Sequence, residues 1–140
     1  MDTKEEDILK QALRRCVGMA RGVVVLDENL LELEQALSQL NMHVVTPDPG
    51  MSDHKIAKKL LGGRILITKN SKDFVELAPI YDYGIINLDN LKYIDPSKEK
   101  TNKTAMLISN ILSKAGLWSR RGAFILTIMN DGNYSITDLE

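Results

Sequence analysis

The stretch Val23-Val24-Val25-Leu26-Asp27-Glu28-Asn29 decides how the rest of the sequence is interpreted. Three β-branched residues and a leucine without a polar break are typical of a strand that is buried on both faces. Two carboxylates and an amide follow at once. Because ligands in open α/β sheets gather outside the carboxyl ends of the strands, this run predicts polar chemistry where the strand ends. The alternative is that Asp27 or Asn29 only caps the next helix.

The composition indicates one ordinary globular domain. The chain has 140 residues, a hydrophobic fraction of 44% and a formal net charge of -1. A near-neutral chain has no overall attraction for nucleic acid, so any such binding needs a local basic patch. Cys16 is the only cysteine, which excludes a disulfide framework within the chain. The charged first residues do not resemble a signal peptide, and no apolar run approaches about 18 residues, so we expect a cytoplasmic protein with no membrane partner.

Apolar spacing predicts that helices and strands alternate along the chain. The expected helices cover residues 3–20, 30–40, 52–61, 75–77 and 97–115, and the expected strands cover 23–26, 43–46, 64–68, 84–88, 123–129 and 134–139. This alternation implies a parallel sheet with right-handed crossovers, and Asn130-Asp131-Gly132-Asn133 predicts a closing hairpin. We therefore expect a single α/β domain over residues 1–140. It should be a three-layer sandwich with a mostly parallel central sheet, helices on both faces and a C-terminal β-hairpin.

Acidic residues stand at three of the expected element ends. Asp27 and Glu28 follow the first strand, Asp53 lies in the first turn of a helix, and Asp73 follows the third strand. Carboxylates that converge repel one another, and a hard divalent cation is the usual compensation. Water bound to Mg²⁺ or Mn²⁺ can attack a phosphodiester. The alternative for Asp53 is that it is only a favourable partner of the helix dipole.

The string Thr68-Lys69-Asn70-Ser71-Lys72-Asp73-Phe74 is the most informative part of the sequence. Together with Leu26-Asp27, Ser52-Asp53-x-x-Ile56-Ala57 and the strand that ends at Thr68, it resembles the PIN-domain family of metal-dependent nucleases. The resemblance covers about residues 23–88. It is greatest to the short bacterial PIN-like branch, whose first strand ends in Asp-Glu-Asn. Gly84-Ile85-Ile86 and the C-terminal Arg121-Gly122-Ala123-Phe124 also resemble that branch.

This resemblance implies a PIN-like fold and an endoribonuclease that cleaves RNA phosphodiesters with water activated by carboxylate-bound Mg²⁺ or Mn²⁺. The implied catalytic residues, which also hold the metal together with Glu28, are Asp27, Asp53 and Asp73. The implied supporting residues are Glu28, Asn29, Thr68 and Asn70, and the implied phosphate-binding residues are Lys69 and Lys72. Longer family members carry a further Glu on a helix for which residues 29–52 leave no room. Either Glu28 replaces it or the metal site is weaker. The alternative for Thr68 is a cap at the strand end.

The resemblance also implies a toxin of a toxin–antitoxin pair, with an antitoxin protein as a partner beside RNA. A homodimer through the helix at 3–20 is one expectation, and the same helix covering its own sheet is the other.

Two further functions stay open. One is a PIN-like RNA- or protein-binding module with little or no activity. The weaker one is a receiver-like domain. This chain has no Asp directly after the third expected strand, where a receiver domain carries its phosphoacceptor. Trp118 beside Arg120-Arg121 either stacks on unpaired bases or anchors the hairpin.

Overall fold

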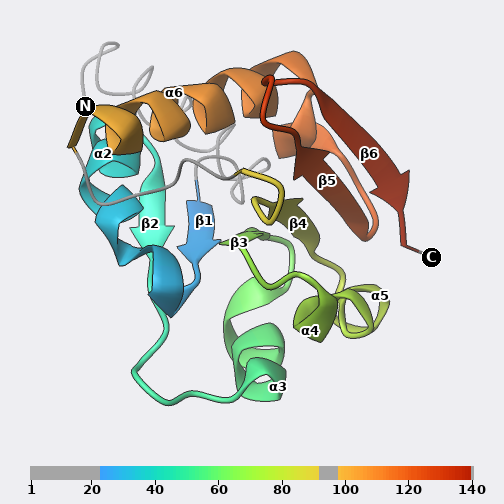
Figure 1. Ribbon diagram of the computed structural model, residues 1–140. Helices are drawn as coiled ribbons and strands as arrows, with labels where there is room; N and C mark the ends of the chain where they lie inside the picture. Colours follow the sequence, from blue (N-terminus) through green and yellow to red (C-terminus); the bar gives the residue numbers. More distant parts are fainter. Residues whose placement is uncertain (1–22, 92–97, 140) are drawn as a thin grey trace, which may run out of the picture.

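The computed structural model describes residues 23–91 and 98–139, so the helix expected at 3–20 lies outside the described residues. One six-stranded sheet has the order β2-β1-β3-β4-β5-β6 (Figure 1). Neighbouring strands are parallel except β5 and β6, which form the expected antiparallel hairpin. The strands are β1 (Val23–Leu26), β2 (His43–Val45), β3 (Ile65–Thr68), β4 (Gly84–Asn87), β5 (Phe124–Ile128) and β6 (Tyr134–Asp138).

Helices cover both faces of the sheet and give the expected three-layer α/β arrangement (Figure 1). They are η1 (Glu28–Leu33), α2 (Glu34–Gln39), α3 (Asp53–Ile56), η2 (Ala57–Leu61), α4 (Lys72–Val75), α5 (Ala78–Tyr81), α6 (Lys98–Lys114) and η3 (Leu117–Ser119). Side chains alternate along each strand, so Val24 and Leu26 pack against η1, α2 and α6, whereas Val25 packs against α3, η2, α4 and α5. Each face therefore has its own hydrophobic core.

The helix expected at 30–40 is built differently from the prediction. It begins at Glu28 as a 3₁₀-helix and becomes α-helical only at Glu34. The backbone is kinked at Leu30, where φ is -124° and ψ is 24°, and both Leu30 and Leu33 are fully buried. Asn29 lies within η1, so the prediction that it caps this helix was wrong.

The segment that follows β3 also differs from the prediction. Instead of one short helix over 75–77, α4 begins at Lys72 and a second helix, α5, begins at Ala78. Pro79 lies in the first turn of α5, where its missing N–H costs little, but it cannot continue a helix from before it. Asp73 therefore lies in the first turn of α4.

The helix expected at 52–61 is confirmed in its position. Ser52 caps it, with the Ser52 side chain accepting a hydrogen bond of 3.2 Å from the Lys55 backbone N–H. One turn of α-helix then passes into five residues of π-helix, η2. This cap fixes the start of α3, and with it the place of Asp53.

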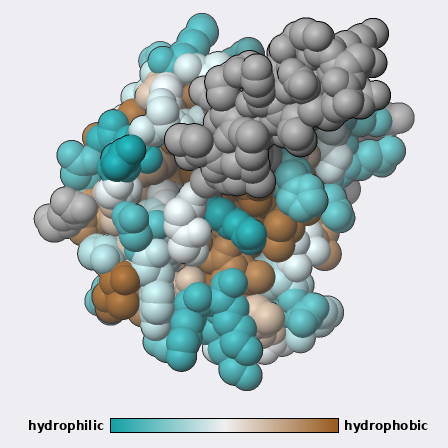
Figure 2. Space-filling model, turned by 180° about the vertical axis from the view of Figure 1, so that it is seen from behind, coloured by the Kyte–Doolittle hydropathy of each residue, from teal (hydrophilic) through white to brown (hydrophobic). Residues whose placement is uncertain are grey.

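The surface of the described residues is mixed in character. Figure 2 shows the molecule from behind, with hydrophobic side chains gathered near the middle of the face and hydrophilic ones around them. Within residues 23–91 and 98–139, no helix has both the length and the apolar character that crossing a membrane requires.

Candidate functional site

The carboxyl ends of β1, β3 and β4 are level with one another. The Asp27 backbone N–H donates to the Ile67 carbonyl at 3.1 Å, and the Leu88 N–H donates to the Thr68 carbonyl at 2.8 Å. The polar residues at these ends, Asp27, Thr68 and Asn87, therefore stand in one row along the edge. Asn87 was not singled out from the sequence, although its place at the end of an expected strand was the available signal.

Thr68 connects two of the predicted site residues. It is fully buried, and its hydroxyl donates to Asp27 Oδ2 at 2.6 Å. The same oxygen accepts a hydrogen bond of 2.9 Å from the Asn70 backbone N–H. Because that N–H occupies an acceptor position, the hydroxyl proton is directed to Asp27. The two interpretations of Thr68 are thus both realised, since it caps the strand end and orients the carboxylate.

Asn70 extends this chain of hydrogen bonds to α4. Its side-chain Nδ2 donates to Asp73 Oδ2 at 2.5 Å. The interactions Asp27–Thr68–Asn70–Asp73 therefore run without a break from the end of β1 to the first turn of α4. The string from Thr68 to Asp73 holds two carboxylates in fixed orientations, which is how residues around a metal site usually act on its ligands.

Asp53 faces the same group of acids from the start of α3. Its pKa is raised, first by partial burial and then by the negative charges of Asp73, Asp27 and Glu28. Like charges disfavour ionisation in this way only when they are close. The structure thus brings Asp27, Asp53 and Asp73 together at one edge, with Glu28 nearby.

The acidic side chains are not arranged as a complete metal-binding site. Among the described residues, no three His, Cys, Asp or Glu side chains are placed to hold one ion as they stand. Glu28 and Asn29 are exposed at the start of η1, and the Asn29 side chain has no hydrogen bond to another described residue. Lys69 and Lys72 are exposed, and they adjoin Thr68 and Asp73 in the sequence. Asp27, Asp53 and Asp73 lie at the same edge of the sheet, and rotation of their side chains alters the distances between the carboxylate oxygens.

Tyr83 is a neighbour of the site that the sequence did not reveal. Its hydroxyl donates to the Phe74 carbonyl at 2.5 Å, and its side chain is almost fully buried. Burial raises the pKa of Tyr83, and the charge of Asp53 raises it further. Tyr83 precedes β4, at the opposite edge of the sheet, and its ring packs in the core under α3, α4 and α5. Only the length of the side chain brings the hydroxyl near the acids, and no sequence spacing reports that.

His54 and Tyr81 form a second contact that was not predicted. His54 Nε2 and the Tyr81 hydroxyl oxygen are 3.0 Å apart, and the two rings meet edge to face with centroids 5.7 Å apart. This pair joins α3 to α5. It therefore holds the helix that carries Asp53 against the rest of this face.

A hard divalent cation fits the donors at this edge. Carboxylates are the ligands that Mg²⁺ and Mn²⁺ prefer, and a positive ion would offset the negative charges that, after burial, raise the pKa of Asp53. Comparison of the chain with protein-family models, with curated proteins and with solved structures finds no match in any of the three. The PIN-like resemblance therefore stays a prediction, and the functional argument depends on the geometry.

Proposed function

We propose that this chain is a Mg²⁺- or Mn²⁺-dependent endoribonuclease with a PIN-like active site. The observation that carries the proposal is the chain of hydrogen bonds that runs from Asp27 through Thr68 and Asn70 to Asp73 at the carboxyl edge of the sheet, with Asp53 close enough to be affected by their charges. Acids that meet at the carboxyl edge of a parallel sheet destabilise one another unless a ligand compensates them. The hydrogen bonds from Thr68 and Asn70 support the same function, because they hold the Asp27 and Asp73 carboxylates in fixed orientations.

Each residue has a distinct role in the proposed reaction. Asp27, Asp53 and Asp73 would hold the cation, and Glu28 would complete the site. When bound, the metal would supply an activated water and would neutralise charge on the phosphate. Lys69 and Lys72, which are exposed, hold the RNA phosphates in place. Tyr83 positions α4 from below through its hydrogen bond to the Phe74 carbonyl.

A second candidate function is an RNA- or protein-binding module that keeps the fold without the reaction. It is favoured by the finding that no three acidic or histidine side chains within residues 23–91 and 98–139 are arranged for one ion. Both functions use the same edge of the sheet. They differ in whether RNA is cleaved there.

Cleavage of single-stranded RNA by the purified chain distinguishes the two functions. We expect cleavage with Mn²⁺ or Mg²⁺, none with excess chelator, and its loss in Asp27→Asn and Asp73→Asn, with each fold intact. The matched control is Glu34→Gln, which removes an exposed acid on α2 and should change nothing. Cleavage that persists in chelator contradicts the nuclease proposal. RNA binding without cleavage across varied sequences supports the binding module.

The toxin role, the antitoxin partner and the homodimer remain proposals that depend on the resemblance. Expression of the chain in a bacterium tests the first. We expect growth arrest from the parent and normal growth from Asp27→Asn at equal protein level. Equal growth with both would contradict the toxin role but leave the proposed reaction intact.

A further inference from the structure

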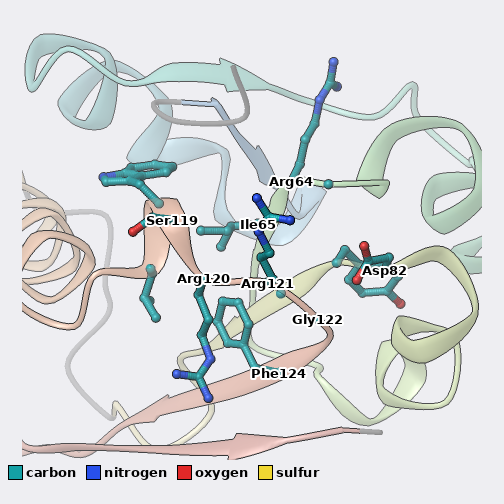
Figure 3. Close-up of a pocket in the computed structure, with 13 residues that line it drawn as sticks. Arg64, Ile65, Asp82, Ser119, Arg120, Arg121, Gly122 and Phe124 are labelled. Carbon is teal, nitrogen blue, oxygen red and sulfur yellow. The ribbon is translucent and has the colours of Figure 1, made fainter. Parts of the chain in front are cut away.

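A second polar site lies at the opposite edge of the sheet from the acids. A cavity of about 550 Å³ opens where β3, β4 and β5 begin (Figure 3). Its walls come from the residues just before these strands and from η3 with the loop that follows it. Small-molecule sites in proteins have volumes of about 300–1,000 Å³, so the cavity is large enough for a ligand of nucleotide size.

Three arginines line this amino-edge cavity, and two of them already have partners. Arg64 Nη1 donates to the Leu60 carbonyl at 3.2 Å. Arg120 Nη2 forms an ion pair of 2.6 Å with Asp138 Oδ1, and its guanidinium lies 5.4 Å from the centre of the Phe124 ring. Both therefore hold parts of the fold together.

Arg121 differs from the other two arginines. Its guanidinium makes no hydrogen bond or ion pair with any residue in the described part of the chain. Figure 3 shows it directed into the cavity toward Ile65, whereas the neighbouring Arg120 points the other way, toward the hairpin. The positive φ of 83° at Gly122 turns the chain immediately after this pair. A guanidinium with all its donors available presents the fork geometry that matches a phosphate.

The other groups of the cavity suit the rest of a nucleotide. Trp118 packs against the hydrophobic core, is half-buried and lines the cavity, so its indole brings a flat aromatic ring to the site. Asp82 lies at the other end of the cavity from Ser119, with Arg121 between them in the view of Figure 3. The Asp82 carboxylate has no partner among the described residues and can accept from hydroxyl or amino groups. A carboxylate here disfavours a purely acidic ligand, because such a ligand would be repelled.

We propose that the amino-edge cavity binds a nucleoside monophosphate. Arg121 holds the phosphate, the base stacks on Trp118, and Asp82 accepts hydrogen bonds from sugar hydroxyl or base amino groups. The ligand is either a free mononucleotide or the terminal nucleotide of an RNA strand, since both present the same chemistry. This site is separate from the acidic edge and does not require the proposed nuclease activity.

Trp118 is the only tryptophan in the sequence, so its fluorescence reports this cavity directly. The test titrates the full chain, with excess chelator, against AMP, GMP, CMP and UMP in turn, with adenosine and inorganic phosphate as fragments. We expect saturable quenching by at least one nucleotide. Arg121→Ala should weaken that binding about tenfold or more, and Asp82→Asn should weaken it severalfold. Adenosine and inorganic phosphate should each bind more weakly than the nucleotide.

The controls keep this result apart from the acidic edge and from misfolding. Lys58→Ala removes an exposed cation on η2 that does not line the cavity, and Asp27→Asn alters only the other edge, so both should bind as the parent does. Arg121→Lys keeps the positive charge but loses the paired N–H donors of the guanidinium, so it should bind the nucleotide with intermediate affinity. A 5′-phosphorylated RNA that binds more tightly than AMP, with the same dependence on Arg121, identifies the strand end as the source. Absence of saturable quenching by all four nucleotides, or affinity unchanged by Arg121→Ala in a folded protein, overturns the proposal.

Discussion

At the scale of single residues, Thr68 organises the carboxyl edge of the sheet. It is fully buried, and its one hydroxyl serves both Asp27 and the Asn70 backbone. Valine has almost the same shape but no hydroxyl. Thr68→Val therefore removes the orientation of Asp27 while leaving the packing of β3 in place.

We expect Thr68→Val to lower the affinity for Mn²⁺ by about 10–100-fold, the usual effect of losing a group that orients a metal ligand. The protein should stay folded but lose about 1–3 kcal/mol of stability, because a buried N–H and a carboxylate lose a partner. Calorimetric titration with Mn²⁺ measures the first effect and urea unfolding the second. Thr127→Val is the matched control, since within the described part of the chain its hydroxyl accepts one hydrogen bond, from Asn87 Nδ2 at 3.4 Å. Equal Mn²⁺ affinity in parent and Thr68→Val would contradict this role.

Asp53 gives a prediction about pH. Its folded-state pKa is raised by burial and by the charges of Asp73, Asp27 and Glu28, so the folded protein binds this proton more tightly than the unfolded chain. Its contribution is therefore most favourable at low pH and is lost as pH rises through the folded pKa. Asp53→Asn cannot ionise. It should be more stable than the parent at pH 7, by up to about 0.5 kcal/mol because the group is largely solvated, and about equal below pH 4.

Melting curves with Mn²⁺ complete the test of Asp53. At a hundredfold excess over its dissociation constant, the ion should stabilise the parent by about 2.7 kcal/mol, and Asp53→Asn should lose most of this gain. Glu34→Gln is the control, because Glu34 is also an acid in the first turn of a helix, α2. If Asp53 were only a dipole partner, its amide would behave like that control, with a loss of a few tenths of a kcal/mol at pH 7 and an equal response to Mn²⁺.

The sequence indicated most of the residues at this edge, for a physical reason. Strand ends and helix starts can be read from apolar spacing, and in a parallel sheet they share an edge, which places Asp27, Asp53, Asp73 and Thr68. Tyr83 could not be found in this way, because its hydroxyl contacts the Phe74 carbonyl, beside Asp73 in the chain, only by the length of its side chain across the core. Asn29 faces solvent within η1, and its supporting role stays a prediction.

At the scale of secondary-structure elements, the contact between β4 and β5 depends on Gly84. A Cβ built at Gly84 would lie 2.2 Å from the Phe124 ring. Both residues are buried, and Gly84 is the register partner of Phe124. The absence of a side chain at Gly84 thus allows the Phe124 ring to approach the backbone of the neighbouring strand this closely.

Gly84→Ala should destabilise the protein by about 1–3 kcal/mol or more, because the Phe124 ring must move within a packed core. Chemical unfolding measures the loss. Gly62→Ala is the control: its Cβ would meet nothing closer than the Tyr81 carbonyl, at 3.6 Å, so we expect little change. A loss in Gly84→Ala no larger than that in Gly62→Ala would show that this close approach is unimportant.

Element types were less predictable than element positions. The strands and the long helix α6 lie within a residue or two of their expected bounds, because apolar alternation and spacing report burial directly. The 3₁₀-helix η1 and the π-helix η2 were both expected to be ordinary α-helix. Apolar residues at spacings of three and four fit all three helix types, and the choice between them is made by tertiary packing.

At the scale of the whole molecule, a net charge of -1 limits how RNA can bind. The proposed contacts are few and local, chiefly Lys69 and Lys72. We expect the logarithm of RNA affinity to fall shallowly with the logarithm of salt concentration, corresponding to about 2–4 released ions. Lys69→Ala should lower this count by about one, and Lys58→Ala should not change it. A steep dependence that Lys69→Ala leaves unchanged would place the RNA on another face.

The central claim is that Asp27, Asp53 and Asp73 form one divalent-metal site at the carboxyl edge of the sheet. A crystal structure of the full chain with Mn²⁺, with the ion located by its anomalous scattering, tests this claim most directly. The account predicts an anomalous peak at this edge, with carboxylate oxygens of these three residues at about 2.1 Å and water in the remaining positions. Thr68 should still donate to Asp27. A map with no peak at this edge, or with Mn²⁺ held by other acids, would contradict the account.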